Sequence, residues 1–400
     1  MIKLAIDSVR LVTKGSLAYY IWMAFLTLVL VAAVPSLVAQ VTDGLIITGM
    51  SDSVSWGFYI ANFTFLVGLA AGAVMLVIPA YAFKNKAAKD VVLLGELLAI
   101  SALIMCLLFI VADMGRPDRM LHMMPPFGIF NWPTSMLTWD VIVLNGYLAI
   151  NIFVCAYLIL SKYFGLKANP KIYMPVVFLS IFWAFSIHTV TAFLYAGLAG
   201  RPFWNEALVA PKFIATAFAA GPAFIAVALQ VVDKAFKFGI PREVYRLLGL
   251  IVFISLSIAL FFTGSEIFTA LYGNASDSKH LLYTMHGFKG AHGLVLFHEV
   301  SLIMNLIGFF ILLIPKLRNH MGWFTFACIM IFVGIWIEKG MGFVIPGFIP
   351  NPLGEIQEFL PTGRELMISA AVWATGLMIY TLMLKVAVPI LKGEIGRTRK

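Results

Sequence analysis

Residues 91–113 read VVLLGELLAISALIMCLLFIVAD, a stretch that carries one acidic residue, Glu96, before Asp113 ends it. A membrane-spanning helix needs about 20 consecutive, mostly apolar residues. This stretch therefore predicts a helix that crosses a bilayer. Nine other stretches of the chain have the same character, so ten spans are predicted. They cover residues 17–41, 57–83, 91–113, 136–161, 174–198, 211–233, 246–272, 291–315, 322–347 and 365–391.

The composition of the whole chain agrees with this prediction. Of 400 residues, 62% are hydrophobic and 12% are charged, and the mean hydropathy is +0.96. Soluble domains are about half apolar and about a quarter charged. Ten spans also leave no room for a soluble domain of ordinary size. We expect residues 1–400 to form a single all-α integral membrane domain.

The positive charges indicate an orientation in the membrane. The net charge is +9, and 20 of the 28 Lys and Arg residues lie on alternate connections, at 1–14, 84–89, 162–171, 234–246, 316–318 and 385–400. Cytoplasmic connections carry such an excess. Both termini are therefore predicted to be cytoplasmic, and the charge does not indicate a nucleic-acid partner. The first span, too long for a cleaved signal sequence, is interpreted as a retained signal anchor.

The cysteines argue against several kinds of metal site. Cys106, Cys155 and Cys328 each lie inside an apolar run, without a C-x-x-C motif or a Cys/His cluster. Structural zinc, iron–sulfur clusters and covalently attached haem need such clusters. We expect no metal, iron–sulfur cluster or disulfide framework in this chain.

Ionisable residues inside the spans are the first candidates for function, because a charge near the bilayer centre costs roughly 2.5 to 3.5 kcal/mol. Acids and imidazoles bridged by water can relay protons to a redox ligand. The alternative is ordinary pairing or extension to the interface, and for Glu96 and Asp233 we favour that alternative. The candidate proton pathway comprises Glu96, Asp233, Glu266, His298, Glu299, Glu338 and Lys339.

Two other functions are compatible with parts of this set of ionisable residues. An ionic site at Glu299 and Glu338 would suit a secondary transporter, although broken helices at matched positions are not evident. A haem b would need two axial histidines on facing helices, and only His188 and His298 lie well inside spans. The repeated His pair that is typical of stacked haems is missing, so we expect no haem.

The connection from Asp113 to Asp140 concentrates charged and aromatic residues at one interface. It contains Arg116, Trp132 and Trp139, and Trp139 directly precedes Asp140. An acid beside a flat ring would suit a quinone headgroup, with Asp140 taking the hydroxyl proton. An interfacial aromatic belt with surface ion pairs explains the same residues equally well.

Several motifs resemble the NrfD/PsrC family of membrane quinone-interacting subunits. They are Asp113-Met-Gly-Arg-Pro117, Gly200-Arg-Pro-Phe-Trp-Asn205 with Ala210-Pro211, Phe218-Ala-Ala-Gly-Pro222, Trp336-Ile-Glu-Lys-Gly340 and Ile345-Pro-Gly-Phe348. The length of the chain makes it look most similar to the ten-helix branch, which includes DsrP and HmeC of sulfate-reducer complexes, QrcD and the large subunits of alternative complex III.

The resemblance implies a fold and an activity. It implies two four-helix bundles plus two extra helices in a prokaryotic cytoplasmic membrane, without haem or metal. It implies menaquinone or ubiquinone bound near the extracytoplasmic face. It also implies electron exchange with an extracytoplasmic ferredoxin-like iron–sulfur subunit, beside further cytochrome or membrane subunits of a respiratory complex.

The resemblance also suggests site residues. Asp140 would be the carboxylate beside the quinone, with Asp113 and His188 as further catalytic candidates. The residues implied to surround the quinone are Tyr59, Asn62, Arg116, Trp132, Trp139, Arg201, Trp204 and Asn205.

A short motif, Gly-Arg-Pro, occurs twice in the chain, which is compatible with an internal duplication. Gly115-Arg116-Pro117 follows the third span and Gly200-Arg201-Pro202 follows the fifth. Gly and Pro punctuate loops often enough to produce such pairs without duplication.

Overall fold

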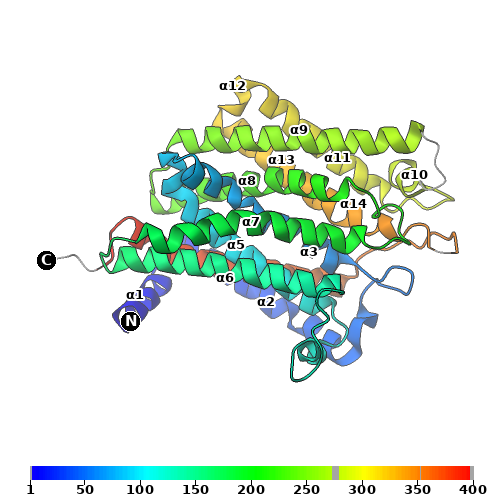
Figure 1. Ribbon diagram of the computed structural model, residues 1–400, viewed down its shortest axis with the longest axis horizontal. Coiled ribbons are helices and arrows are strands. Elements are labelled where there is room, and N and C mark those ends of the chain that lie inside the picture. The colour runs from blue at the N-terminus through cyan, green and yellow to red at the C-terminus, as the bar shows by residue number, and fades with distance from the viewer. Residues whose placement is uncertain (1, 273–278, 352, 397–400) are drawn as a thin grey trace.

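Figure 1 shows the computed structural model, which describes residues 2–272, 279–351 and 353–396. Within these ranges the chain is helical and contains no β-strand. Ten of its helices are long and apolar enough to cross a membrane. The predicted fold class, an all-α polytopic membrane protein, is confirmed.

Each predicted span is present, and its ends lie within a few residues of the predicted ones once the short helices that continue the second and ninth spans, up to Ala82 and Phe348, are included. The spanning helices are α2 (Leu17–Asp43), α3 (Phe58–Gly72), α5 (Lys86–Asp113), α6 (Met136–Tyr163), α7 (Pro170–Ala196), α8 (Val209–Phe236), α9 (Arg242–Tyr272), α11 (Val295–Leu313), α13 (Met321–Lys339) and α15 (Gly363–Leu391). The shorter helices are α1 (Ile2–Thr13), η1 (Gly44–Ile47), α4 (Val74–Val77), η2 (Ile78–Ala82), η3 (Pro117–Met123), α10 (Lys279–His286), α12 (Pro315–Arg318), α14 (Met341–Val344) and η5 (Pro346–Phe348).

Two closed rings of four helices form the body of the molecule. In the first bundle α3 packs on α5, α5 on α6, α6 on α7 and α7 on α3. In the second bundle α8, α9, α11 and α13 are arranged in the same way. The extra helices α2 and α15 pack on each other, and α15 also packs on α5. The expectation of two four-helix bundles plus two helices is therefore confirmed.

The two bundles meet through their first helices, α3 and α8. A Cβ atom built on Gly72 of α3 would lie 2.5 Å from the Cα atom of Gly221 of α8. Small residues allow membrane helices to approach this closely. Just beyond Gly72 the span is no longer a regular α-helix and ends in a π-helical turn at η2 that contains Pro79, whose ring cannot donate a backbone hydrogen bond.

The two Gly-Arg-Pro motifs do not mark equivalent places in the two bundles. Gly115 follows the second helix of the first bundle, whereas Gly200 follows its fourth helix. The likeness between the bundles lies in their helix order and direction, since α3 and α8 run the same way through the molecule (Figure 1).

A buried carboxylate fixes the start of α15 against the first bundle. Glu365 accepts hydrogen bonds from the backbone N–H groups of Phe58, Gly49 and Thr362 at 2.9, 3.2 and 3.4 Å. Together with the Thr362 hydroxyl it forms a capping box. The beginnings of α15 and α3 are thereby held side by side.

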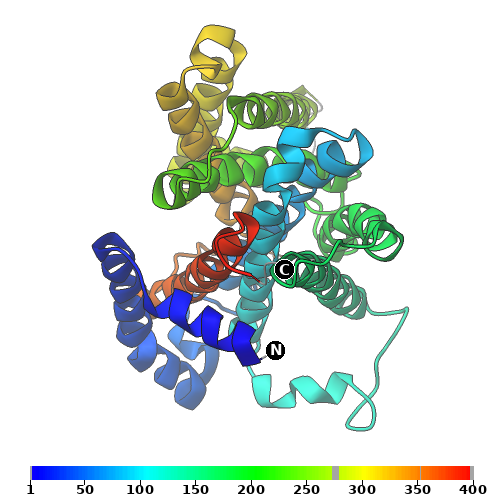
Figure 2. The same ribbon diagram turned by 90° about the vertical axis from the view of Figure 1, so that its left-hand side faces the viewer.

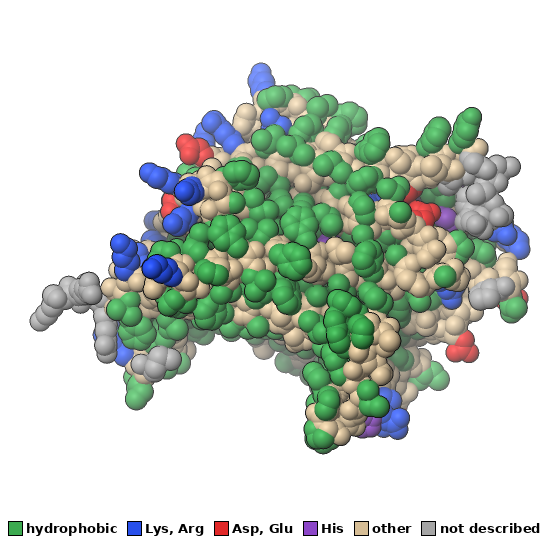
Figure 3. Space-filling model, in the orientation of Figure 1, with side chains coloured by type: hydrophobic (Ala, Val, Ile, Leu, Met, Phe, Trp, Pro, Cys, Tyr) green, Lys and Arg blue, Asp and Glu red, His purple; other side chains and the backbone are tan. Residues whose placement is uncertain are grey.

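The molecule has two distinct ends. Both termini lie at one end, which we call the terminal end, and α1 lies across it (Figures 1 and 2). We call the other end, which carries η3, α10 and η5, the loop end. On the face drawn in Figure 3, hydrophobic side chains cover the middle, and Lys and Arg gather mainly at the terminal end. This distribution is what a multi-pass membrane protein requires.

Candidate functional site

A large cavity lies at the loop end of the first bundle. Its volume of about 530 Å³ is in the range of ligand pockets in proteins. Apolar side chains of α3, α5 and α6 form most of its wall, and the Met-rich segment around η3 covers it. The lining includes Trp56, Ile60, Phe63, Leu107, Ile110, Asp113, Met120, Met123, Met124, Leu137, Asp140 and Leu144.

Two carboxylates from different helices point into this cavity. Asp140, on the second turn of α6, is 4% exposed and accepts a hydrogen bond of 3.0 Å from the Thr191 hydroxyl of α7. Asp113 is the last residue of α5, and its Oδ1 atom is buried without a hydrogen-bond partner in the structure described. Two sparsely partnered acids beside an apolar space can bind hydroxyl or carbonyl groups and exchange protons with them.

Aromatic and thioether groups complete the cavity. Trp56 packs edge-on against Tyr195, with ring centroids 5.4 Å apart, and Tyr195 shares a hydrogen bond with Thr64. Methionine side chains are flexible and polarizable, so the cover formed by Met120 and Met124 can adapt to a flat ligand.

Two of the three tryptophans predicted near the quinone, Trp132 and Trp139, lie outside this cavity. Trp132 and Trp139 contact each other with ring centroids 3.7 Å apart, and neither lines the cavity. Trp139 is half-buried and donates its indole N–H to the Pro133 carbonyl at 2.9 Å. Consecutive residues on a helix do not face the same way. The Trp139 ring therefore points away from the cavity into which Asp140 points.

Three other predicted quinone contacts also lie outside the cavity. Arg116 is exposed and forms an ion pair with Asp118 at 2.8 Å, which lowers the pKa of the Asp118 carboxyl. The Tyr59 hydroxyl donates to Gln40 of α2 at 2.7 Å. The Asn62 side-chain oxygen accepts two indole N–H groups, from Trp336 at 3.0 Å and Trp373 at 2.9 Å, and thereby joins α3 to α13 and α15.

Side chains between Arg201 and Asn205 hold the connection between α7 and α8 against the segment that follows α13. Arg201 donates to the Phe348 carbonyl at 3.3 Å, its guanidinium lies 4.8 Å from the Phe348 ring centroid, and partial burial lowers its pKa. Trp204 is completely buried and donates to the Phe343 carbonyl at 3.0 Å. Asn205 donates to the Ala196 carbonyl at 2.6 Å. These side chains do not line the cavity.

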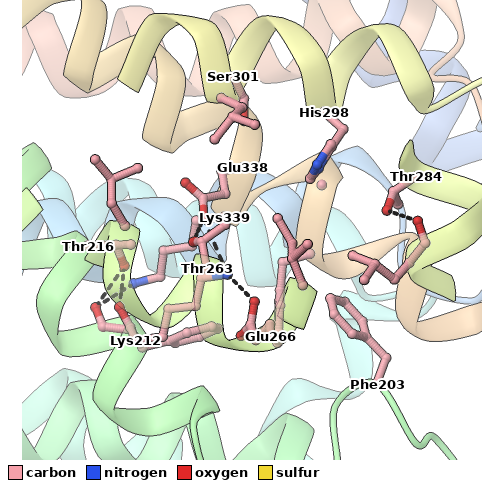
Figure 4. Close-up of a pocket in the computed structure, with 17 residues that line it drawn as sticks. Phe203, Lys212, Thr216, Thr263, Glu266, Thr284, His298, Ser301, Glu338 and Lys339 are labelled. Carbon is pink, nitrogen blue, oxygen red and sulfur yellow. Dashed lines mark hydrogen bonds and ion pairs between the residues drawn. The ribbon is translucent and has the colours of Figure 1, made fainter. Parts of the chain in front are cut away.

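A second, smaller pocket lies inside the second bundle (Figure 4). Lys212 of α8 forms ion pairs with Glu266 of α9 at 2.6 Å and with Glu338 of α13 at 3.3 Å. Glu338 also accepts hydrogen bonds from Thr263 at 3.1 Å and Asn305 at 2.9 Å. The volume is about 60 Å³, enough for a few water molecules.

A buried pair at the junction of the bundles extends this polar group. Lys339, 3% exposed, lines the second pocket, and its Nζ atom lies 3.0 Å from Nε2 of His188, a residue of the first bundle. Lys339 also donates to the Phe213 carbonyl at 3.2 Å. His188 and His298 lie on helices of different bundles, α7 and α11.

The predicted proton pathway divides into two parts. Glu266, His298, Glu338 and Lys339 line the second pocket together. The other three members, Glu96, Asp233 and Glu299, lie apart from it. Glu96 is 2% exposed, with Cys155 Sγ 3.8 Å from its carboxylate.

Asp233 and Glu299 have different surroundings. Asp233 accepts the backbone N–H groups of Gly239 and Ile240 at 2.7 and 3.2 Å, so it closes a turn at the terminal end. Glu299 is exposed on the surface of α11, whereas Glu338 lies inside the second bundle. The ionic site that a transporter would need from Glu299 and Glu338 is therefore not assembled.

Sequence reasoning missed four residues of these sites. Lys212 joins both acids of the second pocket, Thr191 orients Asp140, Trp56 lines the first cavity and Gln40 holds Tyr59. Lys212 could have been identified from the sequence, because it is a cation inside a predicted span, where a charge costs free energy. Thr191, Trp56 and Gln40 carry no local signal.

Among the residues described, no group of three or more His, Cys, Asp or Glu side chains could hold a metal ion. That no haem or iron–sulfur cluster belongs to this chain stays a prediction.

Comparison with known proteins identifies relatives across most of the chain. The family model described as "Polysulphide reductase, NrfD" matches residues 47–347. An "Hdr-like menaquinol oxidoreductase integral membrane subunit" of Archaeoglobus fulgidus is 26% identical over 86% of this chain and 82% of that protein. A "Menaquinone reductase, integral membrane subunit" of Nitratidesulfovibrio vulgaris is 23% identical over 96% of this chain and 94% of that protein.

A third relative, from Halobacterium salinarum, is named as a putative membrane subunit of dimethyl sulfoxide reductase. It is 31% identical over 57% of this chain and 55% of that protein. The chain thus aligns with just over half the length of this relative.

Proposed function

The chain belongs to the NrfD family, and from this premise we propose that it is the quinone-reacting membrane subunit of a respiratory redox complex. It oxidises or reduces menaquinone or ubiquinone in the cavity of the first bundle. The observation that carries the proposal is the apolar cavity of about 530 Å³ into which Asp113 and Asp140 project. Two relatives whose names mention menaquinol or menaquinone support the substrate class.

The two acids have complementary tasks in this proposal. Oxidation of a quinol releases two electrons and two protons and leaves the quinone. Asp140, oriented by Thr191, takes one hydroxyl proton, and Asp113, at the end of α5, takes the other. In the direction of quinone reduction the same carboxyls supply the protons. The apolar wall binds the ring and excludes water.

The electrons pass to or from an iron–sulfur subunit that docks at the loop end. Supporting this site, the chain around η3 both covers the cavity and exposes apolar side chains, Leu121 at 54% and Phe127 at 67%. Further cytochrome or membrane subunits complete the complex. The gathering of basic residues at the terminal end supports cytoplasmic termini and therefore an extracytoplasmic loop end.

The second bundle handles protons in this proposal. Its pocket holds acids, a lysine and room for a few waters, and Lys339 connects it to His188 of the first bundle. Proton movement through this group would couple the redox reaction to charge transfer across the membrane.

The test uses the complex that co-purifies with an affinity-tagged form of this chain. We expect added menaquinol or ubiquinol to reduce iron–sulfur clusters of a co-purifying subunit, followed by electron paramagnetic resonance. A visible spectrum and a solute-uptake assay on the isolated chain in liposomes examine the haem and transporter alternatives. A complex that exchanges no electrons with either quinone would contradict the proposal.

A further inference from the structure

A second large cavity adjoins the first on the outside of the first bundle. It lies between α2, the end of α5 and α15, and its volume is about 720 Å³. Most of its wall is aliphatic, from residues such as Leu37, Val41 and Leu108, and a polar rim at the loop end includes Asp43 and Arg116.

The two cavities are neighbours across the end of one helix. Val111 and Met114 line both of them, so the last turn of α5 is their common wall. A ligand with its headgroup between Asp113 and Asp140 therefore has the second cavity immediately beside it.

The second cavity opens toward the lipid side of the molecule. Its outer wall is α2, the span with the smallest buried share of all ten described, 17% of its apolar window. Val41 at its mouth is 83% exposed. A molecule that dissolves in the bilayer can reach this mouth without crossing water.

The principal polar side chain in the wall is already engaged. Gln40 donates to the Ala112 carbonyl at 2.6 Å and accepts the Tyr59 hydroxyl at 2.7 Å. It holds α2 against α5 and α3 and needs no partner from a ligand. Away from the polar rim, the remaining wall offers apolar contact, which favours a hydrocarbon chain.

We propose that this cavity, lined by Leu37, Val41, Leu108, Val111 and Met114, binds the isoprenoid tail of the quinone whose headgroup occupies the first cavity, and that the tail enters past α2. The inference rests on the proposed function, since it names a site for the tail of the same substrate. The adjacency of the two cavities at Val111 and Met114, together with the exposed Val41 at the mouth, supports this occupant.

The experiment compares two quinols on the complex purified through this chain. One is menaquinol with its long isoprenoid tail, and the other is a naphthoquinol without a tail. Val41→Trp narrows the mouth of the second cavity. Val38→Trp is the matched control, because Val38 is a 55% exposed valine on the same helix that does not line the cavity.

The expected result is a selective change in KM. In Val41→Trp the KM for long-tailed menaquinol rises roughly tenfold, as expected when a few methylene contacts are lost. Its kcat and the kinetics of the tail-less quinol stay at the wild-type values, because only uniform binding is lost. Val38→Trp leaves both substrates unchanged.

Several outcomes would overturn the inference. They are equal effects on both quinols, no effect on either, or the same effect in Val38→Trp. Loss of a co-purified phospholipid from Val41→Trp with unchanged KM values would show that a lipid occupies the cavity instead. A wild-type complex that turns over neither quinol refutes the proposed function itself, whereas turnover of the tail-less quinol with an unaltered KM for menaquinol in Val41→Trp refutes the tail site alone.

Discussion

The two bundles have the same four-helix ring and treat their buried acids in opposite ways. In the first bundle, Asp113 and Asp140 border a cavity of about 530 Å³, and Asp113 Oδ1 has no partner in the structure described. In the second bundle, Glu266 and Glu338 are paired with Lys212 around a space of about 60 Å³.

This difference separates two kinds of chemistry. An acid without a partner beside an apolar space is available to a ligand. Acids held by a lysine are occupied with each other, and the small space between them suits water and protons. Under the proposed function, the substrate site and the proton-handling site would lie in adjacent bundles, with His188 and Lys339 in contact at the junction.

Removing the cation of the second bundle should have the largest effect. Lys212→Met leaves Glu266 and Glu338, which are only partly exposed, without their cation. Breaking a fully buried ion pair costs about 3–5 kcal/mol. The free energy of unfolding, measured by denaturant titration in detergent, should fall by up to that amount.

A neutral version of the same cluster is the control. Adding Glu266→Gln and Glu338→Gln to Lys212→Met should restore most of the lost stability, because no unpaired charge remains. Equal stability of Lys212→Met and wild type would contradict the paired state of the second bundle.

The counterpart in the first bundle is Asp140→Asn. This isosteric change keeps the Thr191 contact but removes proton exchange, a contribution of about 10²-fold or more. We expect the quinol-linked rate to fall about a hundredfold with little change in stability. Glu299→Gln, on the exposed face of α11, should retain the wild-type rate. If Asp140→Asn kept the full rate, the cavity acid would have no catalytic part.

Asn62→Leu examines how firmly the bundles are joined. It leaves the indole N–H groups of Trp336 and Trp373 without their acceptor, and an unsatisfied buried donor costs about 1–3 kcal/mol. The unfolding free energy should fall within that range. In a double-mutant cycle, Trp373→Phe should cost less in the Asn62→Leu background than in wild type. Additive costs would contradict the shared hydrogen bond.

The smallest effect is expected for Arg116→Ala. Arg116 is exposed, pairs with Asp118 and does not touch the first cavity, so the quinol-linked rate should stay within about twofold of wild type. The low pKa of Asp118 means that the pair is present at neutral pH and is lost as the pH falls through that pKa. A large loss of rate in Arg116→Ala would show that the arginine reaches the substrate.

The spans could be predicted because crossing a bilayer is a local requirement on length and apolar content. Residues 91–113 satisfy it alone, and α5 begins five residues earlier and ends at Asp113. The irregular end of the second span was not predicted. It depends on Pro79 and on the close packing that Gly72 makes with a helix about 150 residues away.

Site residues could be predicted only where burying the residue in a membrane costs free energy by itself. Asp140 and Glu338 could be identified because an acid inside a membrane span costs free energy and therefore indicates a function. Their partners, Thr191 and Lys212, come from other helices and could not be assigned from sequence distance. Trp139 directly precedes Asp140 in the sequence but does not line the cavity, because consecutive side chains on a helix point in different directions.

The most direct measurement is photolabelling of the purified complex with a quinone that carries an azide on its headgroup, followed by peptide mapping. We predict labels on the walls of the first cavity, within residues 107–124 or 137–145, that excess menaquinol prevents. Asp140→Asn should still be labelled, since the cavity is unchanged. Labels around Lys212, Glu266 or His298 in the second bundle, or labelling that quinol does not prevent, would contradict the assignment of the substrate to the first bundle.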